Sequence, residues 1–104
     1  MDIEIKRTGP ESLYVTAAGR LDLDNAVNYG TKIKELIEDI DDVITDLTLD
    51  FSEITFISSF GLKVILELYK QLKEKNGTIK LKNVSEQLVN SFKMVGFDKF
   101  LIFV

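Results

Sequence analysis

The sequence predicts an α/β fold: a mixed, mostly parallel sheet of four or five strands with helices chiefly on one face. Strand-like and helix-like segments follow one another in the order ββαβαβα, with a last apolar run as a further strand, and such alternation is typical of parallel sheets with right-handed crossovers. The strands alternate apolar and polar residues, whereas strands buried on both faces are apolar throughout. A chain of 104 residues with 45% hydrophobic residues suffices for one core, so we expect a single domain over 1–104.

The first two strands are predicted from patterns of period two near the N-terminus. Residues 2–7 and 13–18 both alternate apolar and polar side chains. Gly9-Pro10 between them favours a turn, which predicts an antiparallel hairpin. Gly19 is expected to end the second strand.

The first helix is predicted over 25–40, with Asp24 as its N-cap. Its apolar stripe recurs at every third or fourth residue and consists of Ala26, Tyr29, Ile33, Ile37 and Ile40. The third strand follows at 46–51, and an apolar bridge over 54–57 leads out of it.

The second helix is predicted over 60–75 by another apolar stripe. Ser58 or Ser59 begins it, and Asn76-Gly77 closes it. A fourth strand follows at 78–82, where apolar and polar residues again alternate.

The C-terminal part of the chain predicts a third helix and a last apolar segment. The helical stripe consists of Leu88, Val89, Phe92 and Val95. Asn83 stands at capping-box spacing from Glu86, and Ser85 is a rival cap. Gly96 is expected to end this helix in the left-handed conformation. Residues 101–104 form a final strand or a packed tail.

Composition excludes several classes of function. Without Cys or His, the chain has no thiolate nucleophile, no nitrogen or sulfur ligand for zinc, and no histidine-based hydrolytic triad. Phosphate-binding motifs of the P-loop and GxGxxG types are absent. We therefore expect no enzyme activity, no cofactor and no metal. The net charge of −4 disfavours nucleic-acid binding. No apolar run is long enough to span a bilayer and the N-terminus has no apolar signal region, so a cytoplasmic protein is expected.

Charge is unevenly distributed along the chain. Five basic and thirteen acidic residues precede Ser59, and eight basic and four acidic residues lie from Ser59 onward. Acidic residues are densest over 38–46, and basic residues gather over 70–82. Two interpretations stay open: ordinary solvated segments, or a bipolar surface that orients a protein partner.

Two segments that follow strands carry the candidate site: GRLDLDNA after the second strand and ITFISSFGL after the third. Both lead into helix N-termini at the carboxyl ends of strands, where functional groups collect and anions are attracted. Ser58 and Ser59 either only cap the helix or include a phosphorylation site. Asp22 and Asp24 either serve the loop and the helix cap or contact a partner, and two carboxylates are a weak signal for a divalent ion.

The phenylalanines divide into two groups. Six of them are assigned to the core: Phe51, Phe56, Phe92, Phe97, Phe100 and Phe103. Phe60 stands at the start of the second helix, beside the candidate partner surface. Core packing and an exposed anchor are equally compatible with that position.

These segments resemble the STAS family, which comprises bacterial anti-sigma factor antagonists and the homologous domains of sulfate transporters. GRLDLDNA is similar to the family's G-x-L-D loop, LDFSEITFISSFGLKVIL to its strand, loop and helix, and KNVSEQLVNSFKMVGFDKFLIF to its last helix and terminal segment. The resemblance covers essentially the whole chain. It places the family's phosphorylated serine at Ser59 and its loop aspartate at Asp22. Two positions depart from the pattern, because Ser58 replaces an aspartate and Phe60 replaces a serine.

The resemblance implies a regulatory switch. The unphosphorylated protein would bind an anti-sigma factor that is also a GHKL-type serine kinase, and thereby free a sigma factor. Phosphorylation of Ser59, with Ser58 as the alternative acceptor, would end the complex, and a PP2C-type phosphatase would restore it. The expected partner-binding residues are Asp22, Asp24, Ser58, Ser59, Phe60 and Gly61. The departures at Ser58 and Phe60 favour an alternative, a STAS interaction or scaffold module that is not phosphorylated, and a nucleotide or small-ligand binder at the GRLDLDNA loop is a third hypothesis.

Overall fold

The computed structural model describes residues 1–39 and 43–104, and it contains one five-stranded sheet in the order β1-β2-β3-β4-β5. The elements are β1 (Ile3–Gly9), β2 (Ser12–Leu21), α1 (Leu23–Ile37), β3 (Asp46–Ile57), α2 (Ser59–Glu74), β4 (Thr78–Lys82), α3 (Glu86–Met94), a 3₁₀ turn η1 (Phe97–Lys99) and β5 (Ile102–Phe103). β1 pairs with β2 in the antiparallel sense, and all other pairs are parallel. The predicted fold class and element order are confirmed, including the final strand.

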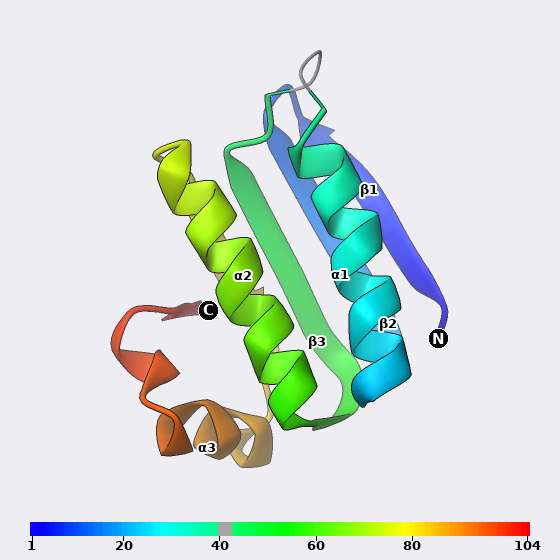
Figure 1. Ribbon diagram of the computed structural model, residues 1–104, viewed down its shortest axis with the longest axis vertical. Helices are drawn as coiled ribbons and strands as arrows, with labels where there is room; N and C mark the ends of the chain where they lie inside the picture. The colour runs from blue at the N-terminus through cyan, green and yellow to red at the C-terminus, as the bar shows by residue number, and fades with distance from the viewer. Residues whose placement is uncertain (40–42) are drawn as a thin grey trace.

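Helices α1 and α2 lie side by side on one face of the sheet, which we call the helix face (Figure 1). The parallel registers align Val15, Leu49 and Leu81 on neighbouring strands, and all three are fully buried. Residues one position further along point to the opposite, bare face, where Asp50 and Lys82 lie in register. The alternation in the sequence therefore predicted correctly that helices cover chiefly one face.

Two strands are longer than predicted. β2 does not end at Gly19, whose φ of +114° and adjacent register shift let the strand bulge and continue to Leu21. β3 likewise does not stop at Phe51, but continues to Ile57 and includes the predicted apolar bridge. The extensions matter because they carry both loops of the candidate site beyond the body of the sheet.

The helix N-termini correct one predicted cap and decide between the two candidates for another. Asp22, not Asp24, caps α1, because its backbone is extended and its carboxylate accepts the Asn25 N–H at 3.3 Å. The helix ends at Ile37, and Ile40 of the predicted stripe lies outside the described residues. Ser58 caps α2, which was one of the two predicted choices.

The third helix also begins at one of its two predicted caps. Ser85 accepts the Leu88 N–H at 3.3 Å, whereas Asn83 adopts a positive φ of 58° just after β4. Gly96 has the predicted left-handed conformation. α3 joins the core through buried Phe92, whose ring centroid lies 6.3 Å from that of Phe51.

Two of the six phenylalanines assigned to the core are exposed at the surface. Phe56 is 37% exposed because Ile54 and Ile57 take the buried positions at this end of β3. The Arg20 guanidinium covers its ring at 4.1 Å. Phe100 is exposed to a similar degree and packs on Tyr69.

Candidate functional site

The two predicted loops meet at one edge of the sheet, where α1 and α2 begin side by side (Figure 1). Leu21 and Ile57 are the last residues of β2 and β3 and lie opposite each other in the parallel register. The Leu21 carbonyl accepts the Ser58 N–H at 3.0 Å and the Ser58 hydroxyl at 2.9 Å. The start of α2 is thus fastened to the end of β2, and both helix N-termini face the same side of the molecule.

Ser58 is fully engaged in this junction. Its hydroxyl donates to Leu21 and accepts the Gly61 N–H at 3.2 Å. Gly61 packs so closely that a Cβ there would lie 2.6 Å from Ile57 and 2.9 Å from the Leu21 carbonyl oxygen. Ser58 and Gly61 therefore have clear roles in holding the loop, and a larger side chain at position 61 would push the helix away from the sheet.

Ser59 differs from Ser58 in its exposure and in its hydrogen bonding. It is the first residue of α2, it is exposed, and its hydroxyl makes no hydrogen bond to any of the residues the structure describes. It sits at a helix N-terminus, where the partial positive charge of the helix favours an added anion. Phe60 follows it with half of its surface exposed, so of the two alternatives at that position the structure shows an exposed ring.

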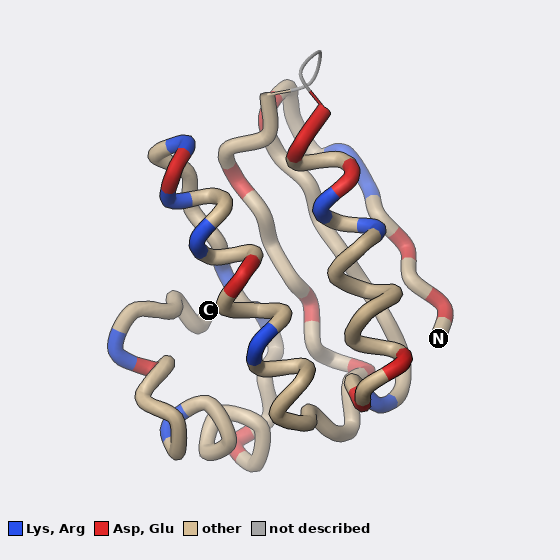
Figure 2. The backbone as a smooth tube through the Cα atoms, viewed as in Figure 1, with Lys and Arg blue, Asp and Glu red and all other residues tan. Residues whose placement is uncertain are grey.

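Asp22 and Asp24 border this junction from α1. Asp22 is half-buried and serves as the cap of α1, while Asp24 is exposed in the first turn. The Asn25 side-chain amide donates to the Arg20 carbonyl at 2.8 Å and closes the loop. Figure 2 shows acidic residues gathered at this lower end of α1. In 1–39 and 43–104, no three Asp or Glu residues gather closely enough to hold a metal ion.

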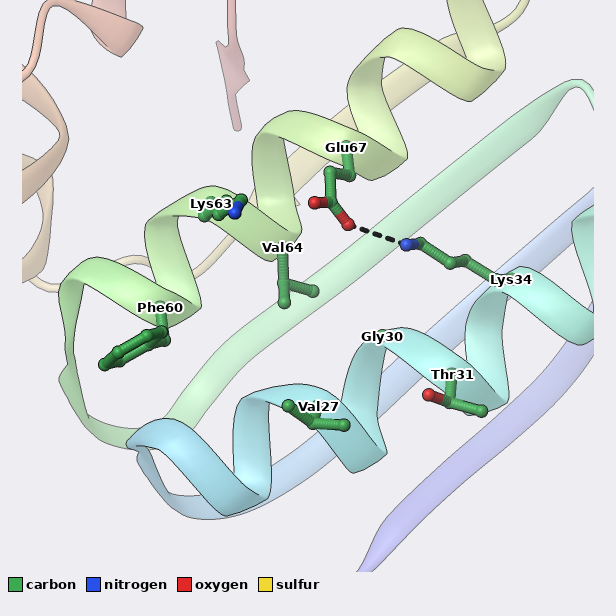
Figure 3. A pocket seen from close by; sticks show the side chains of 8 residues that line it. All are labelled: Val27, Gly30, Thr31, Lys34, Phe60, Lys63, Val64 and Glu67. Carbon is green, nitrogen blue, oxygen red and sulfur yellow. Dashed lines mark hydrogen bonds and ion pairs between the residues drawn. The ribbon is translucent and has the colours of Figure 1, made fainter.

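Beside the junction, α1 and α2 enclose a groove of about 220 Å³ (Figure 3). It is lined by Val27, Gly30, Thr31 and Lys34 of α1 and by Phe60, Lys63, Val64 and Glu67 of α2. A Cβ on Gly30 would lie 2.8 Å from Val64, so this glycine allows the two helices to approach closely. Apart from Phe60, none of these residues is predicted from the sequence to belong to a site.

The groove could have been found from one signal in the sequence. Its residues have the same spacing on both helices, at the first, fourth, fifth and eighth positions starting from Val27 and from Phe60. This spacing forms one face of a helix. Each helix therefore carries a second stripe of apolar, polar and charged residues beside its buried stripe. The two stripes predict a groove only when the two helices are known to pack together.

A cross-helix ion pair closes the far end of the groove. The Lys34 ammonium lies 2.6 Å from the Glu67 carboxylate, and both side chains are partly exposed. Lys34 lowers the pKa of Glu67 through this hydrogen bond, against a smaller opposing effect of burial, and the charges of Lys63 and Lys70 lower it further. The groove lining thus carries two lysines, Lys34 and Lys63, against the one carboxylate of Glu67.

A second polar cluster lies on the bare face of the sheet, away from the junction. Asp50 is only 9% exposed, and its carboxylate accepts the Tyr14 hydroxyl at 2.5 Å, the Ser52 N–H at 2.9 Å and the Asn83 amide at 3.3 Å. Burial alone would raise the pKa of Asp50, but the hydrogen bonds from Tyr14, Ser52 and Asn83 outweigh it and lower the pKa to about 2. The bond to Asp50 in turn raises the pKa of Tyr14.

The structure thus defines an α/β domain that carries an engaged serine and a free serine at one helix N-terminus on its surface. The family model of the STAS domain matches residues 2–104, and the chain therefore belongs to the STAS domain family. Among the described residues, no helix combines the length and apolar character needed to cross a membrane.

Several relatives of this chain are anti-sigma factor antagonists. The anti-sigma-B factor antagonist of Bacillus subtilis is 27% identical over 96 residues, which cover 92% of this chain and 84% of that protein. The anti-sigma factor antagonist SpoIIAA in its unphosphorylated form has the same fold, with a TM-score of 0.80 at 18% identity over 99% of this chain and 87% of the other. The phosphorylated form of the Bacillus cell fate determinant SpoIIAA gives a TM-score of 0.77 at 19% identity, over 99% and 91% of the two chains.

Proposed function

We propose that this chain is an anti-sigma factor antagonist that binds an anti-sigma factor serine kinase of the GHKL type and is switched off when that kinase phosphorylates Ser59. Binding of the unphosphorylated form would release the sigma factor, and a PP2C-type phosphatase would restore that form. The chain would act in the cytoplasm as one STAS domain over residues 1–104, by binding and not as an enzyme. The observation that carries the proposal is the free, exposed hydroxyl of Ser59 beside the fully bonded hydroxyl of Ser58.

The candidate residues divide by role around that hydroxyl. Ser58 and Gly61 hold the loop in place, so that the first turn of α2 would keep the same backbone before and after modification. Asp22 and Asp24 supply an acidic border from α1, and Phe60 offers an exposed ring to the partner. Family membership and the antagonist relative of Bacillus subtilis support this assignment.

A phosphate on Ser59 would change affinity without changing the fold. It adds about −1.5 to −2 charges at a helix end that favours anions, so the same backbone would carry a different surface. Repulsion from the acidic border and the cost of desolvating the phosphate both oppose an interface there. A few kcal/mol of differential affinity suffices for a switch.

Affinity for the purified anti-sigma factor kinase of the same organism, measured without ATP, tests the proposal. Ser59→Ala is expected to bind like the wild type. So is Ser59→Asn, whose side chain is uncharged and nearly isosteric with that of Asp. Ser59→Asp is expected to bind about tenfold or more weakly, because one added charge reproduces part of the effect of a phosphate. Equal affinities of the Asn and Asp variants would overturn the proposed switch.

The second candidate is a STAS interaction or scaffold module that is never phosphorylated. It is favoured by Ser58 and Phe60, which stand where the family pattern has an aspartate and a serine. This candidate predicts that the protein binds its partner and keeps an unchanged mass after incubation with the kinase and ATP.

A further inference from the structure

The groove between α1 and α2 begins directly beside the proposed phosphorylation site. Phe60, which follows Ser59, forms one end of the groove, and the Lys34–Glu67 pair forms the other (Figure 3). Between these ends lie Val27 and Val64, and Val27 leaves 56% of its surface to solvent. Two apolar side chains in this groove, Val27 and Phe60, leave about half of their surface exposed to solvent. A partner that covered them would gain from their desolvation.

The charges around the groove select the kind of partner. Lys34 is paired with Glu67, and Lys63 also lines the groove, so the lining carries one positive charge more than it has carboxylates. Lys63 lines the groove one helical turn after Ser59. An acidic side chain is therefore the complement of this end, and an apolar side chain is the complement of the end at Phe60.

We propose that this groove receives an acidic amphipathic segment of the anti-sigma factor kinase, with an apolar side chain between Val27 and Phe60 and a carboxylate on Lys63. The inference rests on the proposed function for the identity of the partner, and it adds a contact surface beyond the loops that carry Asp22 and Ser59. The groove also gives Phe60 a definite role, because its ring forms a wall that a smaller residue would leave open.

Affinities for the purified kinase without ATP test the groove. Lys63→Glu reverses the charge offered to the partner, and Val27→Asp places a charge in the apolar half. Both are expected to weaken binding about tenfold or more, whereas Lys63→Arg is expected to retain it. The matched control is Lys32→Glu, which makes the same charge change at an exposed position of α1 that does not line the groove. It is expected to stay within about twofold of the wild type, because remote surface charges are screened.

Two further measurements distinguish loss of the groove contact from misfolding of the variants and from failure of the phosphorylation switch. Val27 and Lys63 are both exposed, so urea unfolding of both variants is expected to match the wild type within about 0.5 kcal/mol. If Lys63→Glu and Val27→Asp bind like Lys32→Glu while Ser59→Asp still binds weakly, the groove is overturned and the switch stands. If the groove variants bind weakly but Ser59→Asp binds like the wild type, the groove is supported and the switch fails. Absence of any binding by the wild type overturns both.

Discussion

The two polar clusters of this protein, one around Asp50 and one around Ser59, are built in opposite ways. Asp50 is buried on the bare face and collects hydrogen bonds from three different parts of the chain. The Ser59 side chain is exposed at the start of α2, and its hydroxyl bonds to none of the described residues. A polar group that finds its partners within the chain holds the fold together, and one that is left without partners on a fixed surface is available to another molecule. The predictions below test this distinction.

The largest expected effect is on stability at the Asp50 cluster. Asp50→Ala removes the acceptor for Tyr14, the Ser52 N–H and Asn83, and is expected to lower the free energy of unfolding by about 3 kcal/mol, since hydrogen bonds to charged groups are strong. Urea denaturation followed by circular dichroism measures it. Asp24→Ala, at an exposed carboxylate, is the control and is expected to change stability by less than about 0.5 kcal/mol. Similar losses for both variants would remove the distinction between the two clusters.

The same carboxylate predicts a loss of stability in acid. The pKa of Asp50 is lowered from 3.8 to about 2 in the folded protein, so the folded state binds fewer protons than the unfolded state between these values. Its contribution is therefore complete above about pH 4 and is lost as the pH falls toward 2. The free energy of unfolding is measured from pH 5 to pH 2 in steps of roughly one pH unit. It is expected to fall less steeply for Asp50→Asn than for the wild type. Parallel curves would show that Asp50 is not the titrating group.

A smaller effect separates the two adjacent serines. Ser58→Ala removes the cap of α2 and the bond to the Leu21 carbonyl, and is expected to cost about 1–2 kcal/mol of unfolding free energy. Ser59→Ala is expected to change it by less than about 0.5 kcal/mol, because no bond to the described residues is lost. Thermal and urea unfolding of the pair decide the point. A larger cost at Ser59 would mean that its hydroxyl supports the fold.

Most of the fold could be predicted because it depends on local periodicity. The alternation in β2 and β3 specified which face is buried, and the apolar stripes located all three helices. The errors fall where tertiary pairing decides. Gly19 is a strand terminator by local rules, but pairing with β3 through a bulge carries β2 past it. Asp24 is a reasonable cap in isolation, but the extended backbone at Asp22 starts the helix earlier.

The candidate site could be predicted in part for the same reason. The position of Ser59 follows from where a strand ends and a helix begins, which the sequence shows. Which of two adjacent serines is engaged depends on the Leu21 carbonyl, 37 positions before Ser58, and no local pattern reports it. The groove requires both helices, since Val27 and Phe60 come together only when α1 packs on α2.

Phosphorylation by the anti-sigma factor kinase of the same organism tests the central claim most directly. The experiment incubates three proteins, the wild type, Ser58→Ala and Ser59→Ala, with the kinase and ATP at a temperature where all three are folded. The intact mass of each protein is then measured by mass spectrometry. The free hydroxyl of Ser59 predicts one phosphoryl group on the wild type and on Ser58→Ala, and none on Ser59→Ala. Phosphorylation of Ser59→Ala, or an unchanged mass of the wild type bound to an active kinase, would contradict the account.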